Sequence, residues 1–101
     1  MQTLPINLPE LIIQQFCQQY HVQKLSLFGS VLRSDFTAES DIDLLVEFTP
    51  ANTPGLFCLA TMQDELSKIL DRTVDLRTPN ELSNYFRDRV LAEAMTIYDS
   101  N

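Results

Sequence analysis

The chain has 101 residues, of which 45% are hydrophobic, and it carries 14 acidic against 7 basic side chains. This length and apolar content predict a single globular domain over residues 1–101 and argue against a disordered chain. The net charge of −7 argues against stable nucleic-acid binding, because Lys and Arg supply most of the affinity for phosphate backbones, and it favours a basic protein partner.

The cysteines, the histidine and the hydropathy of the chain further narrow the class of protein to which it can belong. Cys17 and Cys58 lie in apolar segments without CxxC spacing, so we expect two reduced core thiols. His21 is the only histidine, and we expect it in the turn after the first helix rather than in a zinc site. No apolar run approaches the roughly 20 residues of a membrane span and no signal peptide opens the chain, so we expect a cytoplasmic protein without membrane contact.

The first half of the chain predicts a helix, a strand, a short helix and a loop. Asn7 with Glu10 three residues later has the capping-box pattern, and the helix it opens should run to about Tyr20. Its apolar side is expected to be Leu8, Leu11, Ile12 and Phe16. Residues 24–28 alternate as a strand, residues 30–33 form one or two helical turns, and residues 34–40 form a polar loop.

The second half predicts two strands alternating with two helices. Residues 41–48 are the most strand-like, residues 49–55 form a loop rich in Pro, and a helix over 56–70 carries a core stripe of Leu59, Met62, Leu66, Ile69 and Leu70. We expect Leu56 and Phe57 to pack at its beginning, with a partner contact as the alternative. Residues 72–77 form a third strand. The last helix should place the aromatic rings of Tyr85 and Phe86 in the core, and a partner contact is again the alternative. Residues 96–99 form a short closing strand or a tail.

The resulting order is α-β-α-β-α-β-α, which predicts an α/β (α+β) fold with a small mixed sheet flanked by helices. Three aspartates fall on its predicted strands. Asp41 and Asp43 are two residues apart, so they should point to one face of their strand, about 7 Å apart. Asp75, in the next strand, can join them if the two strands are neighbours. Carboxylates this close repel one another unless a cation lies between them, and Mg²⁺ prefers such oxygen ligands together with substrate phosphates. A third carboxylate makes a two-metal site feasible.

A candidate phosphate-binding turn precedes these acids. Gly29 lets the backbone approach a ligand closely, and the amide and hydroxyl of Ser30 can donate to a phosphate at the start of a short helix. Arg33 is one turn further on. It either reaches a phosphate oxygen or pairs with Asp35 or Glu39, and the sequence favours neither.

The stretch GSVLRSDFTAESDIDL, followed by VDL, resembles the pattern of the nucleotidyltransferase superfamily that includes DNA polymerase β. More narrowly, the chain resembles the minimal nucleotidyltransferases that act as MntA-type antitoxins beside HEPN-domain ribonuclease toxins. The resemblance covers nearly the whole chain, and the ten-residue spacing between Gly-Ser and the first Asp is highly specific to the superfamily. One departure is that relatives often carry Ala-Arg-Gly after this turn, where Leu32, Arg33 and Ser34 stand here, which makes the loop stiffer.

This resemblance implies a polymerase β-like fold and a set of roles. Gly29 and Ser30 would contact the triphosphate, Asp41, Asp43 and Asp75 would hold two Mg²⁺ ions, and Asp75 would also help to activate the acceptor. The reaction would transfer AMP from ATP to a tyrosine hydroxyl of a cognate HEPN-type toxin, and so neutralise it. Two alternatives stay open: an antitoxin that acts by occlusion without catalysis, and a small-molecule nucleotidyltransferase with a separate substrate-binding subunit.

Overall fold

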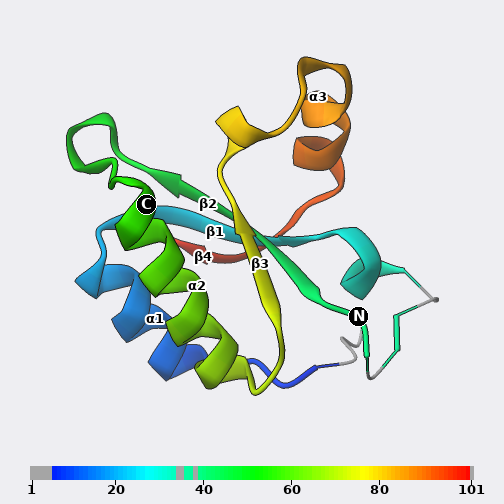
Figure 1. Ribbon diagram of the computed structural model, residues 1–101, viewed down its shortest axis with the longest axis horizontal. Helices are drawn as coiled ribbons and strands as arrows, with labels where there is room; N and C mark the ends of the chain where they lie inside the picture. Colours follow the sequence, from blue (N-terminus) through cyan, green and yellow to red (C-terminus); the bar gives the residue numbers. More distant parts are fainter. Residues whose placement is uncertain (1–5, 34–35, 38, 101) are drawn as a thin grey trace.

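The computed structural model describes residues 6–33, 36–37 and 39–100 (Figure 1). Ser34 and Asp35, which belong to the predicted loop and to one alternative for Arg33, lie outside this description. The elements, in chain order, are α1 (Glu10–Gln19), β1 (Val22–Phe28), the 3₁₀ turn η1 (Gly29–Leu32), β2 (Ile42–Phe48), η2 (Pro50–Asn52), α2 (Leu56–Leu70), β3 (Val74–Arg77), η3 (Pro79–Glu81), α3 (Asn84–Glu93) and β4 (Met95–Asp99).

The strands form a mixed sheet in the order β3-β2-β1-β4. β1 is antiparallel to both β2 and β4, whereas β2 and β3 are parallel. A parallel pair needs a crossover connection, and α2 supplies it. The predicted mixed sheet with flanking helices is confirmed, and the closing segment is a strand, β4, at the edge beside β1.

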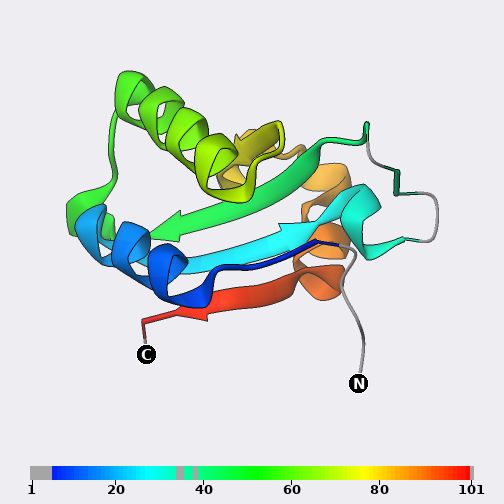
Figure 2. The ribbon, with the colours of Figure 1, turned by 90° about the horizontal axis from the view of Figure 1, so that it is seen from below.

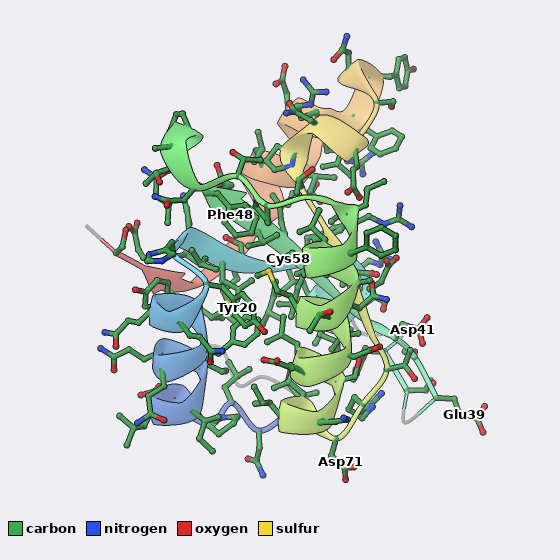
Figure 3. The ribbon with its side chains drawn as sticks, turned by 60° about the vertical axis from the view of Figure 1, so that its left-hand side comes forward. Tyr20, Glu39, Asp41, Phe48, Cys58 and Asp71 are labelled. Atoms are coloured by element: carbon green, nitrogen blue, oxygen red, sulfur yellow. The ribbon has the colours of Figure 1, made fainter. Side chains whose placement is uncertain are left out.

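One face of the sheet is covered by α1 and α2, which lie side by side (Figures 2 and 3). The hydroxyl of Tyr20, just after α1, donates to Glu65 Oε1 of α2 at 2.6 Å. Alternate residues of the strands point into the core between these layers. The buried core consists of Ile13, Phe16, Cys17, Val22, Leu25, Leu27, Val31, Ile42, Leu44, Val46, Met62, Leu66, Val74 and Leu76.

Hydrogen bonds from α2 hold β3, an edge strand, in place. The N–H groups on the outer side of an edge strand have no strand to bond. Here the N–H of Val74 donates to Ser67 Oγ at 3.1 Å, and the N–H of Leu76 donates to Gln63 Oε1 at 2.9 Å. Val74 and Leu76 are buried beneath α2, and Asp75 between them therefore points to the opposite face.

The first helix begins later than predicted. Its N-cap is Pro9, without a side-chain cap hydrogen bond, so the predicted capping box at Asn7 is wrong. The buried residues are Ile13, Phe16 and Cys17, while Leu11 is 68% exposed and Ile12 is also exposed. The apolar run at 11–13 is compatible with two helical stripes, and the stripe that packs on the core is the one with Ile13, Phe16 and Cys17.

The predicted core packing of the last helix is also wrong. Tyr85 is 97% exposed and Phe86 is exposed as well. No residue of α3, which the structure describes in full, is buried, because this helix stands at the end of the sheet away from α1 and α2 (Figure 1). Leu56 and Phe57 are likewise exposed rather than packed at the start of α2.

The expectations for the stripe of α2, the two cysteines and His21 hold. The stripe of α2 packs on the core as predicted. Cys17 and Cys58 are free thiols, and burial raises the pKa of the Cys17 thiol to about 12. His21 lies in the turn after α1 with a φ of 59°. Among the described residues, no helix is both long and apolar enough to span a membrane.

Candidate active site

The face of the sheet opposite α1 and α2 carries a row of three residues from three neighbouring strands. Phe28 of β1 pairs in register with Asp43 of β2, and Asp43 pairs with Asp75 of β3. Because neighbouring strands lie about 4.8 Å apart, this register makes the carboxylates of Asp43 and Asp75 direct neighbours. The sequence-based prediction that Asp75 joins the DxD pair depended on this pairing, which the structure contains.

Gly29 immediately follows this row and contacts Asp43. Its φ is +77°, a left-handed conformation that glycine adopts without strain. A Cβ built at this position would overlap Asp43 Oδ2 and lie 3.1 Å from Asp43 Cγ. Glycine is therefore required twice, by the turn and by the carboxylate that fills the space where a side chain would be.

Asp43 is the electrostatic centre of the site. Partial burial raises its pKa, and the nearby charges of Asp75 and Asp41 raise it further. Arg33 and Arg77 act in the opposite direction. A carboxylate that is repelled by two others gains from any cation placed between them, which is the charge pattern of a site for a metal-bound phosphate.

Asp41 lies just before β2 rather than within it, and its side chain is exposed. Figure 3 places Asp41 near Glu39, on the side of the molecule where α2 ends. A cavity of about 660 Å³ lies here between residues 39–41 and the end of α2. Of the predicted pair, Asp43 therefore lies on β2 and Asp41 lies on the connection that leads into it.

Arg72 fixes the position of the segment that leads into β2. Its Nη2 donates to the backbone oxygens of Thr37 at 2.9 Å and Ser40 at 2.7 Å, and its guanidinium lies 4.8 Å from the ring centroid of Phe36. These contacts tie the segment before Asp41 to the turn between α2 and β3. Sequence reasoning assigned no role to Arg72, since only the folded chain brings it to residues 36–40.

Asp75 is engaged by a neighbouring arginine. Arg77 Nε donates to Asp75 Oδ1 at 3.1 Å and Arg77 Nη2 donates to Asp75 Oδ2 at 3.3 Å. Arg77 Nη1 also lies 3.9 Å from Glu81 Oε2. The sequence contained a signal for this contact, because residues 75 and 77 of a strand point to the same face.

The turn that carries Gly29 faces the last turns of α3. A cavity of about 300 Å³ is lined by Gly29, Leu32, Arg33, Glu93 and Met95. An adjoining cavity of about 320 Å³ shares Gly29, Arg33 and Glu93 and adds Phe28, Arg89 and Val90. The half-buried Ser30 lies within η1, and its carbonyl accepts the backbone N–H of Arg33 at 2.9 Å. The role of α3 as a wall beside this turn was not predicted, because its aromatic residues were expected in the core.

A metal ion would find suitable donors here but no finished set of ligands. Carboxylate oxygens at Asp41, Asp43 and Asp75 are of the type that Mg²⁺ binds. Within the described residues, however, no three His, Cys, Asp or Glu side chains are placed to hold one ion together. The donor chemistry fits, because Mg²⁺ is usually bound by one or two carboxylates and completes its shell with substrate phosphates and water.

Comparisons with known proteins agree with this geometry. Residues 10–97 match the model of the nucleotidyltransferase domain family. A putative protein adenylyltransferase of Methanocaldococcus jannaschii is 35% identical over 79 residues, which cover 78% of this chain and 83% of that protein.

Two solved structures share the fold. A toxin–antitoxin complex with AMP-PNP has a chain that is 24% identical with a TM-score of 0.74, covering 93% of this chain and 76% of the other. A complex of a tri-AMPylated Shewanella oneidensis HEPN toxin with an MNT antitoxin has a chain that is 22% identical with a TM-score of 0.65, covering 90% and 70%. The family match and the curated relative together show that this chain belongs to the nucleotidyltransferase family, as the GS-x10-DxD pattern indicated.

Proposed function

We propose that this chain is an antitoxin that transfers AMP from ATP to a tyrosine hydroxyl of a HEPN-type ribonuclease toxin, acting as a single minimal nucleotidyltransferase domain. The observation that carries the proposal is the register of Asp43 with Asp75 directly beside Gly29. A carboxylate pair next to a glycine turn can bind a metal-bound triphosphate at its phosphates, where transfer takes place.

The proposed reaction is an in-line displacement. The tyrosine oxygen attacks the α-phosphorus of ATP, a new oxygen–phosphorus bond forms, the bond to the bridging oxygen of the β-phosphate breaks, and pyrophosphate leaves. Asp75 accepts the phenolic proton directly or through a water. Asp41, Asp43 and Asp75 would hold Mg²⁺, with two ions expected, and the metal would neutralise the phosphate charge.

The remaining site residues position the nucleotide. Gly29 allows the triphosphate to approach the backbone, and the Ser30 hydroxyl and amide donate to a phosphate oxygen. Arg33 lies close enough to the acids to lower the pKa of Asp43, which supports a role for its charge in binding the phosphates. Chemistry of this type depends mainly on positioning and charge, so this small set is sufficient.

A protein acceptor is supported by the surface that borders the site. The last turns of α3 line the cavities beside Gly29, and the same helix exposes Tyr85, Phe86 and Leu91 to solvent. Exposed aromatic residues are common anchors of protein interfaces. A partner that covers α3 would bring its own hydroxyl to the edge of the acidic site.

The names of the similar proteins agree with this acceptor. The Methanocaldococcus relative is named a protein adenylyltransferase, and one structural neighbour is an MNT antitoxin in complex with an AMPylated HEPN toxin. AMP-PNP accompanies another neighbour, which favours ATP as the nucleotide here.

The test is the intact mass of the proposed HEPN-type toxin partner, after incubation with the chain, ATP and Mg²⁺. We expect mass gains in whole AMP units for the wild-type chain and none for the D41N/D43N double variant. Replacing the modified tyrosine of the toxin by phenylalanine should remove the gain.

The controls separate the alternatives. If the toxin is neutralised equally by the wild-type chain and by D41N/D43N without any mass gain, the chain acts by occlusion and the proposed chemistry is wrong. AMP transfer to a small molecule in the presence of a separate substrate-binding protein, with no effect on the toxin, would instead identify a small-molecule nucleotidyltransferase.

A further inference from the structure

Arg77 contacts Asp75, one of the acids that the proposed chemistry needs for binding the metal. Two of its nitrogens donate to both carboxylate oxygens of Asp75, at 3.1 and 3.3 Å. This forked contact uses the oxygens that a divalent cation would bind. The three acids are also not arranged as a ready metal site among the described residues, and the engagement of Asp75 provides a physical reason.

The contact is built into the strand. Asp75 and Arg77 share the face of β3 that points away from α2, while Val74 and Leu76 are fixed beneath α2 by burial and by hydrogen bonds. The backbone therefore keeps the two side chains on one face, within reach of each other. It compensates a cluster of like charges that would otherwise repel one another in the protein without metal.

Glu81 offers the arginine a second position. Its carboxylate Oε2 lies 3.9 Å from Arg77 Nη1, four residues further along the chain. Both Asp75 and Arg77 keep part of their surface in solvent, so the guanidinium can turn without opening the core. Because two carboxylates lie within reach of the guanidinium, moving it from one to the other costs little free energy.

On the basis of the proposed function, we propose that Arg77 is a positioning residue that competes with the divalent cation for Asp75. In the metal-free protein it holds Asp75 and neutralises the acidic row. When the metal binds, the guanidinium leaves Asp75 and turns toward Glu81. Metal affinity is then set partly by an arginine that never contacts the metal.

The test is the dissociation constant of Mn²⁺, measured by electron paramagnetic resonance on the full chain without nucleotide. We expect R77Q to bind Mn²⁺ about 1.5- to 5-fold more tightly than wild type, a range corresponding to loss of a solvent-exposed ion pair. The matched control is K24Q, which also removes one positive charge. Lys24 lies toward the end of β1 that is farther from Gly29, and it pairs in register with Glu47 and Asp99. K24Q should leave the dissociation constant unchanged.

Two further variants separate the forked contact from the overall charge. R77K keeps the positive charge but not the fork, so its affinity should fall between those of wild type and R77Q. In a D75N background, R77Q should no longer tighten binding. Equal dissociation constants for wild type, R77Q and K24Q, or the same tightening with and without Asp75, would overturn the proposal.

Failure of the proposed function gives a different pattern. If D41N/D43N binds Mn²⁺ as tightly as the wild-type chain does, the acids do not form the metal site and the proposed chemistry is wrong, together with this inference. If that variant loses Mn²⁺ while R77Q matches wild type, only the role of Arg77 is refuted.

Discussion

The two faces of the sheet differ in what they bury and in what they expose. The face beneath α1 and α2 consists of apolar side chains such as Leu27 and Leu44, which are fully buried. The opposite face carries Asp43 in register with Asp75, and Arg77 in register with the buried Leu45. The helix on that side of the site, α3, has no buried residue along its described length.

This difference separates the residues that hold the fold from those that face the reaction. Apolar burial stabilises the first face, and its residues have no reason to contact a ligand. On the second face, like charges are kept together at a cost to stability, and strain and repulsion of this kind are typical of functional sites. Substitutions on the two faces should therefore differ in magnitude and even in sign.

The largest effect on stability is expected from L66A, on the buried side of α2. Leu66 is fully buried, and truncating a buried leucine should lower the free energy of unfolding by about 2–5 kcal/mol. Chemical denaturation measures this change. The matched control is L56A in the same helix, where the side chain is 80% exposed and the loss should stay below about 0.5 kcal/mol. Similar losses for both variants would contradict the assignment of the core face.

The next largest effect is expected from G29A. A side chain there combines an unfavourable left-handed backbone with an overlap at Asp43, so we expect a loss of about 1–3 kcal/mol and the displacement of Asp43. AMP transfer should fall with it. In G55A, a Cβ would meet nothing within 4 Å, so transfer should persist. Transfer by G29A at the wild-type rate would show that the close approach at Asp43 is not required.

The smallest effect on stability is expected from Y85A. The side chain is 97% exposed, so the free energy of unfolding should change by less than about 0.5 kcal/mol. Loss of an aromatic anchor should nonetheless weaken toxin binding by about tenfold or more. Isothermal titration calorimetry with the toxin measures it, and an unchanged affinity would exclude this part of α3 from the interface.

Much of this organisation could be predicted from the sequence. The sequence predicted that Asp75 joins the acids of the preceding strand if the two strands are neighbours, and β2 and β3 pair in this way. The GS-x10-DxD spacing predicted the family, since it combines a glycine turn and two acids at one separation. The stripe of α2 was also readable, because its apolar residues recur at helical spacing over four turns.

The errors have physical causes. The apolar run at 11–13 fits two stripes of α1, and only the packing of the helix on the core, which buries Ile13, Phe16 and Cys17, selects between them. Tyr85 was expected in the core because aromatic residues at helical spacing usually are, but the sequence does not show that no layer covers α3. The contacts of Arg72 with residues 37 and 40 join segments more than thirty positions apart, and local pattern carries no information about them.

Asp43 also predicts a pH dependence of stability. Its pKa is raised above the ordinary value of 3.8 by burial and by Asp75 and Asp41, so the native state holds the proton more tightly than the unfolded state does. The carboxylate therefore opposes folding at pH values above its raised pKa, and this cost disappears as the pH falls toward 3.8. In metal-free protein, D43N should be more stable than wild type near neutral pH, and the advantage should vanish in acid.

The most direct measurement is therefore made on one preparation of D43N, with melting temperature recorded in EDTA and AMP transfer to the toxin recorded with Mg²⁺ and ATP. We predict that D43N melts higher than wild type and transfers no AMP, because Asp43 serves the reaction at the expense of the fold. A D43N variant that transfers AMP as wild type does, or that loses transfer together with thermal stability, would contradict this account.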